Sequence, residues 1–289
     1  MEAINRQSFG KKIRSYSKKP ISMLLMLLVM LAAAVTFSVL LFLIGFILVK
    51  GIPNLKPSLF AWQYTSLNVS LVPSLVTTVM ITALSLLIAV PFGIFTAIYL
   101  VEYAKKGNRV VELIRLTAET LSGIPSIVYG LFGMLFFVTY LGMGFSVLAG
   151  AATLSIMILP LILRTSEEAL KAVPESYREA SFGLGAGRLR TVFRIVMPAA
   201  VPGVLAGIIL AIGRIVGETA ALIYTAGTVA KIPENLLASG RTLALHMYIL
   251  SSEGFNTGEA YATAVVLLVT VLLINTASAR LARRLTKGN

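Results

Sequence analysis

The feature that most constrains this chain is a run of apolar residues, 21–49, that contains no charged side chain. A helix of about 20 mostly apolar residues can cross the hydrocarbon core of a bilayer, so this run is long enough to cross it with some tilt. Basic residues precede the run, as in a signal peptide, but the apolar part of a signal peptide spans only about 7–15 residues. We therefore interpret 21–49 as a retained transmembrane helix.

Five further apolar runs follow, at residues 73–101, 124–141, 145–163, 202–224 and 260–279. The composition agrees with this pattern, because 57% of the residues are hydrophobic and 13% are charged, whereas about 25% are charged in typical soluble domains. The sequence therefore predicts an all-α integral membrane protein with six transmembrane helices. An even number of crossings places both termini on the same side of the membrane.

The distribution of basic residues indicates which side that is. Of the 25 Lys and Arg residues, 20 lie in the two terminal tails and in segments 102–122 and 164–201, while only four lie in the other connecting segments. Because cytoplasmic segments carry the excess of Lys and Arg, we expect both termini in the cytoplasm. The net charge of +13 is then explained by orientation, and a nucleic-acid partner is not needed.

The residue types disfavour several kinds of chemistry. The sequence contains no Cys and no Asp, and its one His is His246. No disulfide framework or thiolate metal site is therefore expected, and an intramembrane enzyme is disfavoured. The sequence also lacks a GxxxxGK[ST] phosphate loop, so any ATP hydrolysis is expected in another polypeptide. We expect no catalytic residue, no metal site and no cofactor bound by this chain.

Segment 164–201 contains a pattern with fixed spacing: Glu179-Ala180-Ser181, three residues, Gly185, nine residues, then Ile195-x-Met197-Pro198. The pattern resembles the EAA loop of ABC-importer permeases, with Ser181 in place of Ala and Met197 in place of Leu. This resemblance implies an importer permease fold and a loop that docks on an ATPase subunit. The residues to which it gives this coupling role are Glu179, Ala180, Ser181, Gly185, Ile195 and Pro198. From the residues alone, an amphipathic helix at the membrane interface is the alternative.

Two charged residues, Arg214 and Glu218, lie within the fifth predicted span. They are four residues apart, so we expect them on one face of a helix. A charge at bilayer depth costs roughly 2.5–3.5 kcal/mol on insertion scales, and such residues usually face a bundle interior or an aqueous cavity. A structural ion pair and a transient anion site both fit these residues. A guanidinium can bind phosphate oxygens in a bidentate manner, which favours the anion site.

The run Arg214-x-x-x-Glu218-Thr219-Ala220 resembles phosphate-specific ABC permeases, as does the run from Gly123 to Gly130. Ala220 indicates the A-type subunit rather than its C-type paralogue, although many A-type members have Pro where this chain has Ala221. The resemblance implies that Arg214, Glu218 and Thr219 lie along the substrate path. For Pro125, Ser126, Tyr129 and Gly130 we expect one of two roles. They either pack helices together or line that path.

The resemblance implies a multi-pass permease subunit in the inner (plasma) membrane of a prokaryote, working in a phosphate importer. Its implied partners are membrane lipid, a paralogous permease in a heterodimer, two cytoplasmic ATPase subunits that use ATP, and an extracytoplasmic phosphate-binding protein. The alternatives are a permease for sulfate or molybdate, the C-type paralogue, and a secondary transporter that works without ATP. The expected divisions are a basic tail (1–20), the first helix (21–49), an outer loop (50–72), a permease domain (73–281) and a tail (282–289).

Overall fold

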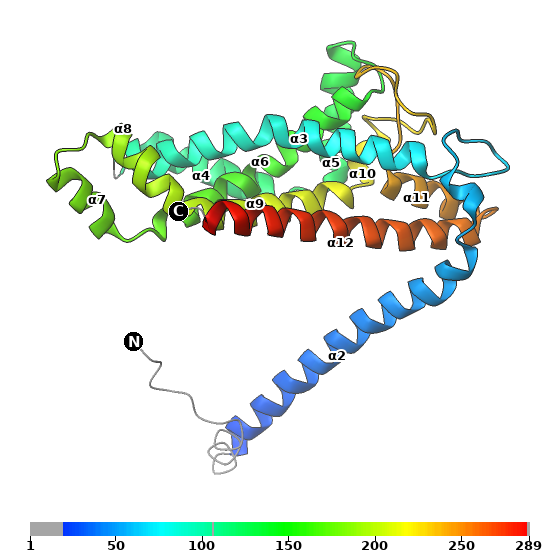
Figure 1. Ribbon diagram of the computed structural model, residues 1–289, viewed down its shortest axis with the longest axis horizontal. Coiled ribbons are helices and arrows are strands. Elements are labelled where there is room, and N and C mark those ends of the chain that lie inside the picture. The colour runs from blue at the N-terminus through cyan, green and yellow to red at the C-terminus, as the bar shows by residue number, and fades with distance from the viewer. Residues whose placement is uncertain (1–19, 106, 288–289) are drawn as a thin grey trace. The chain divides into compact units, whose positions relative to one another are not determined.

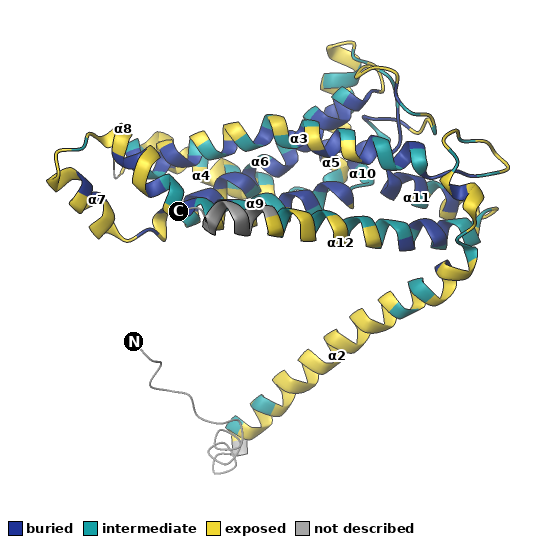
Figure 2. Cartoon of the chain, viewed as in Figure 1, coloured by how far each residue is buried: buried dark blue, intermediate teal, exposed yellow. Residues whose placement is uncertain are grey.

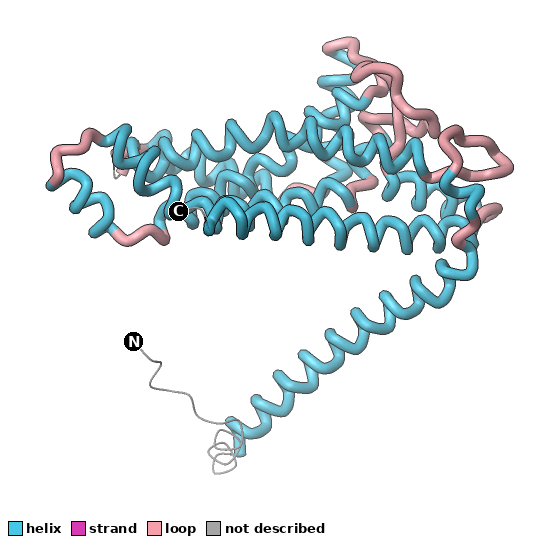
Figure 3. The backbone as a smooth tube through the Cα atoms, in the orientation of Figure 1, coloured by secondary structure: helices cyan, strands magenta, loops and turns pink. Residues whose placement is uncertain are grey.

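The computed structural model describes residues 20–105 and 107–287, and the regular elements of that part are all helical (Figures 1 and 3). The chain divides into two compact units, Met1–Lys50 and Gly51–Asn289. In the first unit, helix α2 (Pro20–Gly51) is apolar on all sides and exposed along nearly its whole length (Figure 2). A helix of this kind is suited to lipid rather than water. The predicted basic tail lies almost entirely outside the described residues.

The second unit contains short helical turns and the other long helices. In chain order these are η1 (Ile52–Asn54), η2 (Pro57–Phe60), α3 (Val72–Ile98), η3 (Tyr99–Tyr103), α4 (Arg109–Ser122), α5 (Ser126–Gly133), η4 (Met134–Tyr140), α6 (Val147–Lys171), α7 (Glu175–Gly183), α8 (Arg188–Thr191), η5 (Val192–Val196), α9 (Met197–Val216), α10 (Ala220–Ile223), α11 (Leu243–Glu253) and α12 (Thr257–Lys287). The turns η3, η4 and η5 are π-helical. Within this unit, α7 and α8 lie at one end of the long helices and α11 lies at the other (Figure 1).

In the part of the chain that the structure describes, five helices are long and apolar enough to cross a membrane, and a sixth span is present if one bent pair counts as a single crossing. That pair joins Arg109–Ser122 to Ser126–Tyr140 with a bend of 103°. The predicted third span, 124–141, is therefore only one arm of a bent structure, and most of the predicted loop 102–122 is helical. The bend follows from Pro125, which cannot continue a helix because it lacks an amide proton and restricts the residue before it.

Other predicted boundaries also differ from the structure, since α9 begins at Met197 rather than at residue 202 and α12 continues to Lys287 rather than ending at residue 279. Helix α6 continues to Lys171, beyond the predicted end at residue 163, because its last turns are amphipathic rather than apolar. Helix α9 ends at Val216, whereas the predicted fifth span continued to residue 224. Of the apolar residues after Val216, Ala221 and Leu222 are buried in a short turn of helix, α10, and Ala226 is buried in the connection that follows it. Hydropathy indicates burial of these residues but not continuity of the helix.

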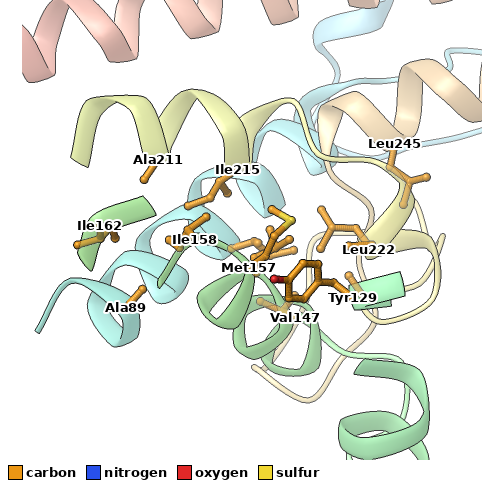
Figure 4. Close-up of a cluster of buried hydrophobic side chains, with 14 residues drawn as sticks. Ala89, Tyr129, Val147, Met157, Ile158, Ile162, Ala211, Ile215, Leu222 and Leu245 are labelled. Atoms are coloured by element: carbon orange, nitrogen blue, oxygen red, sulfur yellow. The ribbon is translucent and has the colours of Figure 1, made fainter. Parts of the chain in front are cut away.

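The core of the second unit lies where α3, α6 and α9 pack together (Figure 4). Met157, Ile158 and Ile162 of α6 are almost fully buried there, and Ile215 of α9 packs against the same cluster. Hydrogen bonds also join α3 to α6, since the Ser85 hydroxyl donates to the carbonyl of Ala151 at 3.1 Å. Helix α6 is thus the central helix of this unit, and its last turns contribute charged side chains to the cavity described below.

Candidate functional site

The α7–α8 segment, residues 174–196, contains most of the pattern found in the sequence. Gly185 adopts φ +80°, a left-handed conformation that favours glycine, and its amide donates to the carbonyl of Phe182 at 2.9 Å. The Ser181 and Thr191 hydroxyls are hydrogen-bonded at 2.8 Å and are both buried. Gly185 therefore makes the turn between α7 and α8, and Ser181 joins the two helices across it.

The surface of this segment is hollowed and partly apolar. A groove of about 450 Å³ is lined by Tyr177, Leu184, Arg190, Arg194 and Ile195, together with Ala180 and Gly185. Leu184 is 90% exposed, and the Tyr177 side chain is half exposed. Glu179 and Ala180 are exposed and Pro198 is half-buried at the start of α9. Exposed apolar side chains next to arginines are typical of a surface that binds another protein.

Arg178 lies beneath this surface and is almost completely buried, with 7% of the residue exposed. Its Nη2 donates to Glu102 Oε1 at 2.7 Å and to the carbonyl of Leu170 at 3.0 Å. Its Nη1 donates to the carbonyl of Val173 at 3.0 Å and to Glu175 Oε2 at 3.2 Å, and its Nε donates to Glu102. The hydrogen bond to Glu102 raises the pKa of Arg178, against the opposing effect of burial.

Arg214 lines a cavity of about 360 Å³ between α4, α6 and α9, and several other charged side chains line it too. Its charged neighbours in the lining are Arg115, Glu119, Arg164, Glu167, Glu168 and Lys171. Glu167 is paired with both Arg115 and Lys171 at 2.7 Å, and Arg164 is paired with Glu168 at 3.2 Å. Arg214 has no ion pair within 4.0 Å among the described residues. The cavity therefore contains four cations and three carboxylates, and Arg214 is the cation without a carboxylate partner.

The expectation that Arg214 and Glu218 share one helical face is wrong. Helix α9 ends before Glu218, and the Glu218 carboxylate instead accepts hydrogen bonds from the amides of Thr219 and Ala221, both at 3.2 Å. A carboxylate in this position satisfies amides at the start of α10. Thr219 lies at the same break and precedes α10. Glu218 thus stabilises the interruption of the helix between α9 and α10, and it does not form an ion pair with Arg214.

The four residues that the sequence predicted near the bend between α4 and α5 differ in how far they are buried. Pro125 is exposed and Ser126 is half-buried, whereas Tyr129 and Gly130 are buried. The Tyr129 hydroxyl donates to the carbonyl of Leu121 at 2.7 Å, across the bend. A Cβ atom on Gly130 would lie 2.9 Å from the Cα of Ala221, so the backbones of α5 and α10 approach closely there.

Sequence reasoning missed several residues of the cavity. Arg164, Glu167, Glu168 and Lys171 were counted only as charges of a cytoplasmic segment, but the structure places them on the last turns of α6. Their spacing of i, i+3, i+4 and i+7 is the available signal, since it places all four on one face of a helix. The pairing of Arg178 with Glu102 has no comparable signal, because the two residues are 76 positions apart.

A second buried arginine lies at the opposite end of this unit. Arg241 is 5% exposed, its guanidinium lies 4.8 Å from the centre of the Tyr64 ring, and its Nε and Nη2 atoms have no hydrogen-bond acceptor among the described residues. His246 packs edge-on against the same ring and is fully buried. Burial, and secondarily the charge of Arg241, lower the pKa of His246 to about 3. His246 is therefore neutral at physiological pH.

Comparison with known proteins identifies the family. Residues 89–288 match the family described as "Binding-protein-dependent transport system inner membrane component", which covers more than half of the chain. The chain belongs to this family. As an inner membrane component with several apolar helices, it is a multi-pass protein of the plasma membrane, as the sequence predicted.

The relatives of this inner membrane component are permeases. It is 33% identical over 266 residues to the probable ABC transporter permease protein YqgI of Bacillus subtilis, covering 86% of this chain and 90% of that one. It is 36% identical over 195 residues to the phosphate transport system permease protein PstA 1 of Mycobacterium tuberculosis, covering 66% of this chain and 64% of that one. The second alignment thus leaves about a third of each protein unmatched.

Solved structures of ABC transporters share the fold. A chain from the crystal structure of a bacterial ABC transporter involved in the import of the acidic polysaccharide alginate matches with a TM-score of 0.67 and 16% identity, over 94% of this chain and 99% of that one. A chain of the inward-facing MetNI methionine ABC transporter matches with a TM-score of 0.58 and 22% identity, over 74% of this chain and 93% of that one. These matches confirm the predicted fold of an ABC-importer permease.

Proposed function

We propose that this inner membrane component is the A-type permease subunit of an ATP-driven phosphate importer. The observation that carries the proposal is the cavity lined by charged side chains in which Arg214 has no carboxylate partner among the described residues. An unpaired guanidinium in a cavity lined by further cations is suited to a small oxyanion, because its planar fork can donate two parallel hydrogen bonds to phosphate oxygens. The relationship to a phosphate transport permease supports phosphate as that oxyanion.

The surrounding charges suit transient rather than permanent binding. Glu167 already pairs with Arg115 and Lys171, so only part of the positive charge in the cavity is available to an anion. Phosphate is thus attracted by Arg214 and repelled by the nearby carboxylates, and the balance allows it to leave. The proposed path continues past the end of α9. There, Glu218 and Thr219 lie in the non-helical connection between α9 and α10, and the Thr219 amide donates to the Glu218 carboxylate.

The charge distribution supports the orientation. The end that contains α7 and α8 carries Arg188, Arg190 and Arg194, and the positive-inside rule assigns such an end to the cytoplasm. Both termini are then cytoplasmic, and the end that contains α11 faces outward. The groove of Tyr177, Leu184 and Ile195 is the proposed docking surface for a separate ATPase subunit that hydrolyses ATP.

The other proposed partners follow from this assignment. A second, paralogous permease would complete the translocation path as a heterodimer, with two ATPase subunits on the cytoplasmic side. An extracytoplasmic phosphate-binding protein would deliver phosphate to the outer end. The family description supports this kind of assembly, as does a solved structure of similar fold, a bacterial alginate ABC transporter in complex with an alginate pentasaccharide-bound periplasmic protein.

The test is phosphate uptake by cells or vesicles that contain the complete transporter with Arg214→Gln. We expect uptake to fall by about tenfold or more, since one bidentate anion contact is lost, while the amount of assembled complex is unchanged. Arg109→Gln is the matched control, because Arg109 is an exposed arginine at the start of α4 that does not line the cavity. Unchanged uptake by Arg214→Gln would remove Arg214 from the path. Competition by excess sulfate or molybdate, but not by excess unlabelled phosphate, would show a different oxyanion.

A further inference from the structure

We infer that the π-helical turn η3, at the end of α3, is the point through which movement of the α7–α8 segment reaches the transmembrane helices, and that Arg178 and Glu102 are the positioning pair of this link. The inference rests on the proposed function, because it concerns how ATP-driven movement at the docking surface reaches the cavity. It adds two residues that lie outside the sequence pattern of this segment and do not touch the substrate.

The first observation is the complete use of the Arg178 guanidinium. A guanidinium has five N–H groups, and the five contacts of Arg178 to Glu102, Glu175 and two backbone carbonyls use all of them. Arg178 belongs to α7, Glu102 belongs to η3, and the carbonyls of Leu170 and Val173 belong to the end of α6 and the connection after it. One buried side chain thus joins three parts of the unit.

The second observation is that η3 is held from α8 as well. The guanidinium of Arg188, the first residue of α8, lies 5.4 Å from the centre of the Tyr103 ring. Tyr103 is the residue next to Glu102, so both arms of the α7–α8 segment contact adjacent residues of one turn. π-Helical turns interrupt the regular pattern of an α-helix and occur frequently at functional sites.

The third observation is what η3 is attached to. It continues directly from α3, which packs along α6, and the last turns of α6 hold Arg164, Glu167 and Lys171 in the lining of the Arg214 cavity. Buried apolar residues of η3, α6 and η5, among them Leu100, Leu170 and Val192, fill the space between these elements. When a partner displaces α7, the Arg178 contacts move α3 and α6 with it, and the charges around the cavity change position.

The two carboxylates on Arg178 provide a matched pair for the test. Glu102 is 7% exposed, whereas the Glu175 side chain is 72% exposed. A buried charge that loses its partner is strongly destabilised, whereas an exposed pair contributes little. Of these two carboxylates, Glu102 is therefore the one through which Arg178 joins α7 to η3, whereas Glu175 belongs to α7 itself. Glu102→Gln keeps an oxygen acceptor and removes the charge, so it weakens this contact without emptying the site.

The experiment measures how many phosphate ions the complete transporter in proteoliposomes imports per ATP hydrolysed. The binding protein and phosphate are supplied at concentrations that saturate uptake. For Glu102→Gln, we expect the ratio to fall by about tenfold, with assembly and ATP hydrolysis retained. For Glu175→Gln, we expect a ratio within about twofold of the unmodified complex. An unchanged ratio in Glu102→Gln overturns the inference, and absence of ATP-driven phosphate uptake by the unmodified complex overturns the proposed function itself.

A second measurement does not depend on removing the buried pair. The chain contains no cysteine, so Tyr103→Cys with Arg188→Cys provides a specific site for a short bifunctional thiol reagent when cysteine-free partners are used. Because η3 and α8 move as one body in this mechanism, the cross-linked complex is expected to retain the transport rate of the same double variant before cross-linking. Loss of transport on cross-linking would show that the two elements separate during the cycle, and it would overturn the inference.

Discussion

The two ends of the second unit each bury an arginine, but they satisfy it in different ways. Arg178 has two carboxylates and two carbonyls around it, and every N–H group has an acceptor. Arg241 is equally buried, but two of its nitrogens lack an acceptor among the described residues, and its guanidinium lies over the face of the Tyr64 ring. The first charge is fully bonded to the protein, whereas the second is only partly compensated by a cation–π contact.

The difference shows that burial alone does not reveal the role of a charged side chain. A buried arginine whose hydrogen bonds come from several elements holds these elements in one arrangement, and removing an acceptor leaves an uncompensated charge. A buried arginine without acceptors stabilises the fold little, because desolvation opposes the interactions that it makes. Arg214 is a third case, since it is half-buried in a cavity that an anion can enter.

The largest expected effect is on the Arg178 side of this comparison. Glu102→Ala leaves the Arg178 charge buried with only the exposed Glu175 nearby, so the free energy of unfolding should fall by about 3 kcal/mol or more. Thermal unfolding of the purified protein in detergent measures this change as a lower midpoint. A midpoint equal to that of the unmodified protein would show that Arg178 and Arg241 do not differ in the way described.

The next largest effect is on how stability depends on pH, through His246 at the end of the unit that contains Arg241. Folded His246 has a pKa of about 3, whereas an unfolded histidine has a pKa of about 6.5. As the pH falls below 6.5, the unfolded state takes up a proton that the folded state does not, so stability decreases as the pH falls toward 3. Between pH 6.5 and pH 5 the loss amounts to about 2 kcal/mol.

The measurement is the unfolding midpoint at pH 7.5 and at pH 5, for the unmodified protein and for His246→Gln. The variant lacks the titrating ring, so its midpoint should fall less between these two values. All other titrating groups are common to both proteins and cancel in the difference. Equal decreases in the two proteins would contradict a buried, neutral His246.

Arg241→Met is expected to change the free energy of unfolding by less than Glu102→Ala or the change in pH does. Methionine has a similar length and no charge, so the variant removes an uncompensated cation and keeps most of the packing on Tyr64. We expect the free energy of unfolding to change by less than about 1 kcal/mol, or to increase. The pKa of His246 should move up toward its ordinary value, because the charge of Arg241 contributes to lowering it. A large loss of stability would place Arg241 in the same class as Arg178.

The smallest effect is expected for Glu175→Ala. Its side chain is 72% exposed and lies at 3.2 Å from Arg178, and exposed ion pairs contribute about 0.5 kcal/mol or less. The unfolding midpoint should therefore differ little from that of the unmodified protein. This variant sharpens the comparison within one guanidinium, since the buried and the exposed carboxylate contact the same side chain. If Glu102→Ala and Glu175→Ala lowered the unfolding midpoint equally, the result would contradict the conclusion that the buried Glu102 contact stabilises Arg178 more than the exposed Glu175 contact.

Much of the fold could be predicted because it depends on local composition. The apolar runs that became α2, α3, α6, α9 and α12 were recognised from their length and lack of charge. The glycine of the α7–α8 turn was found from its spacing, and its φ of +80° explains why this position favours glycine. The end of α9 was predicted wrongly, because a run of apolar residues has the same hydropathy in one helix as in two segments that meet at a bend.

By itself, the sequence determined that this chain spans a membrane repeatedly and contains a pattern of fixed spacing around Gly185. These properties depend on the transfer of apolar side chains from water and on backbone conformations set by single residues, which are local effects. Only the tertiary structure decided that Glu218 accepts from the amides of Thr219 and Ala221, that Glu102 accepts from Arg178, and that two nitrogens of Arg241 have no acceptor among the described residues. Which groups compensate a buried charge depends on distances between residues far apart in the chain, and those distances are determined only when the helices pack.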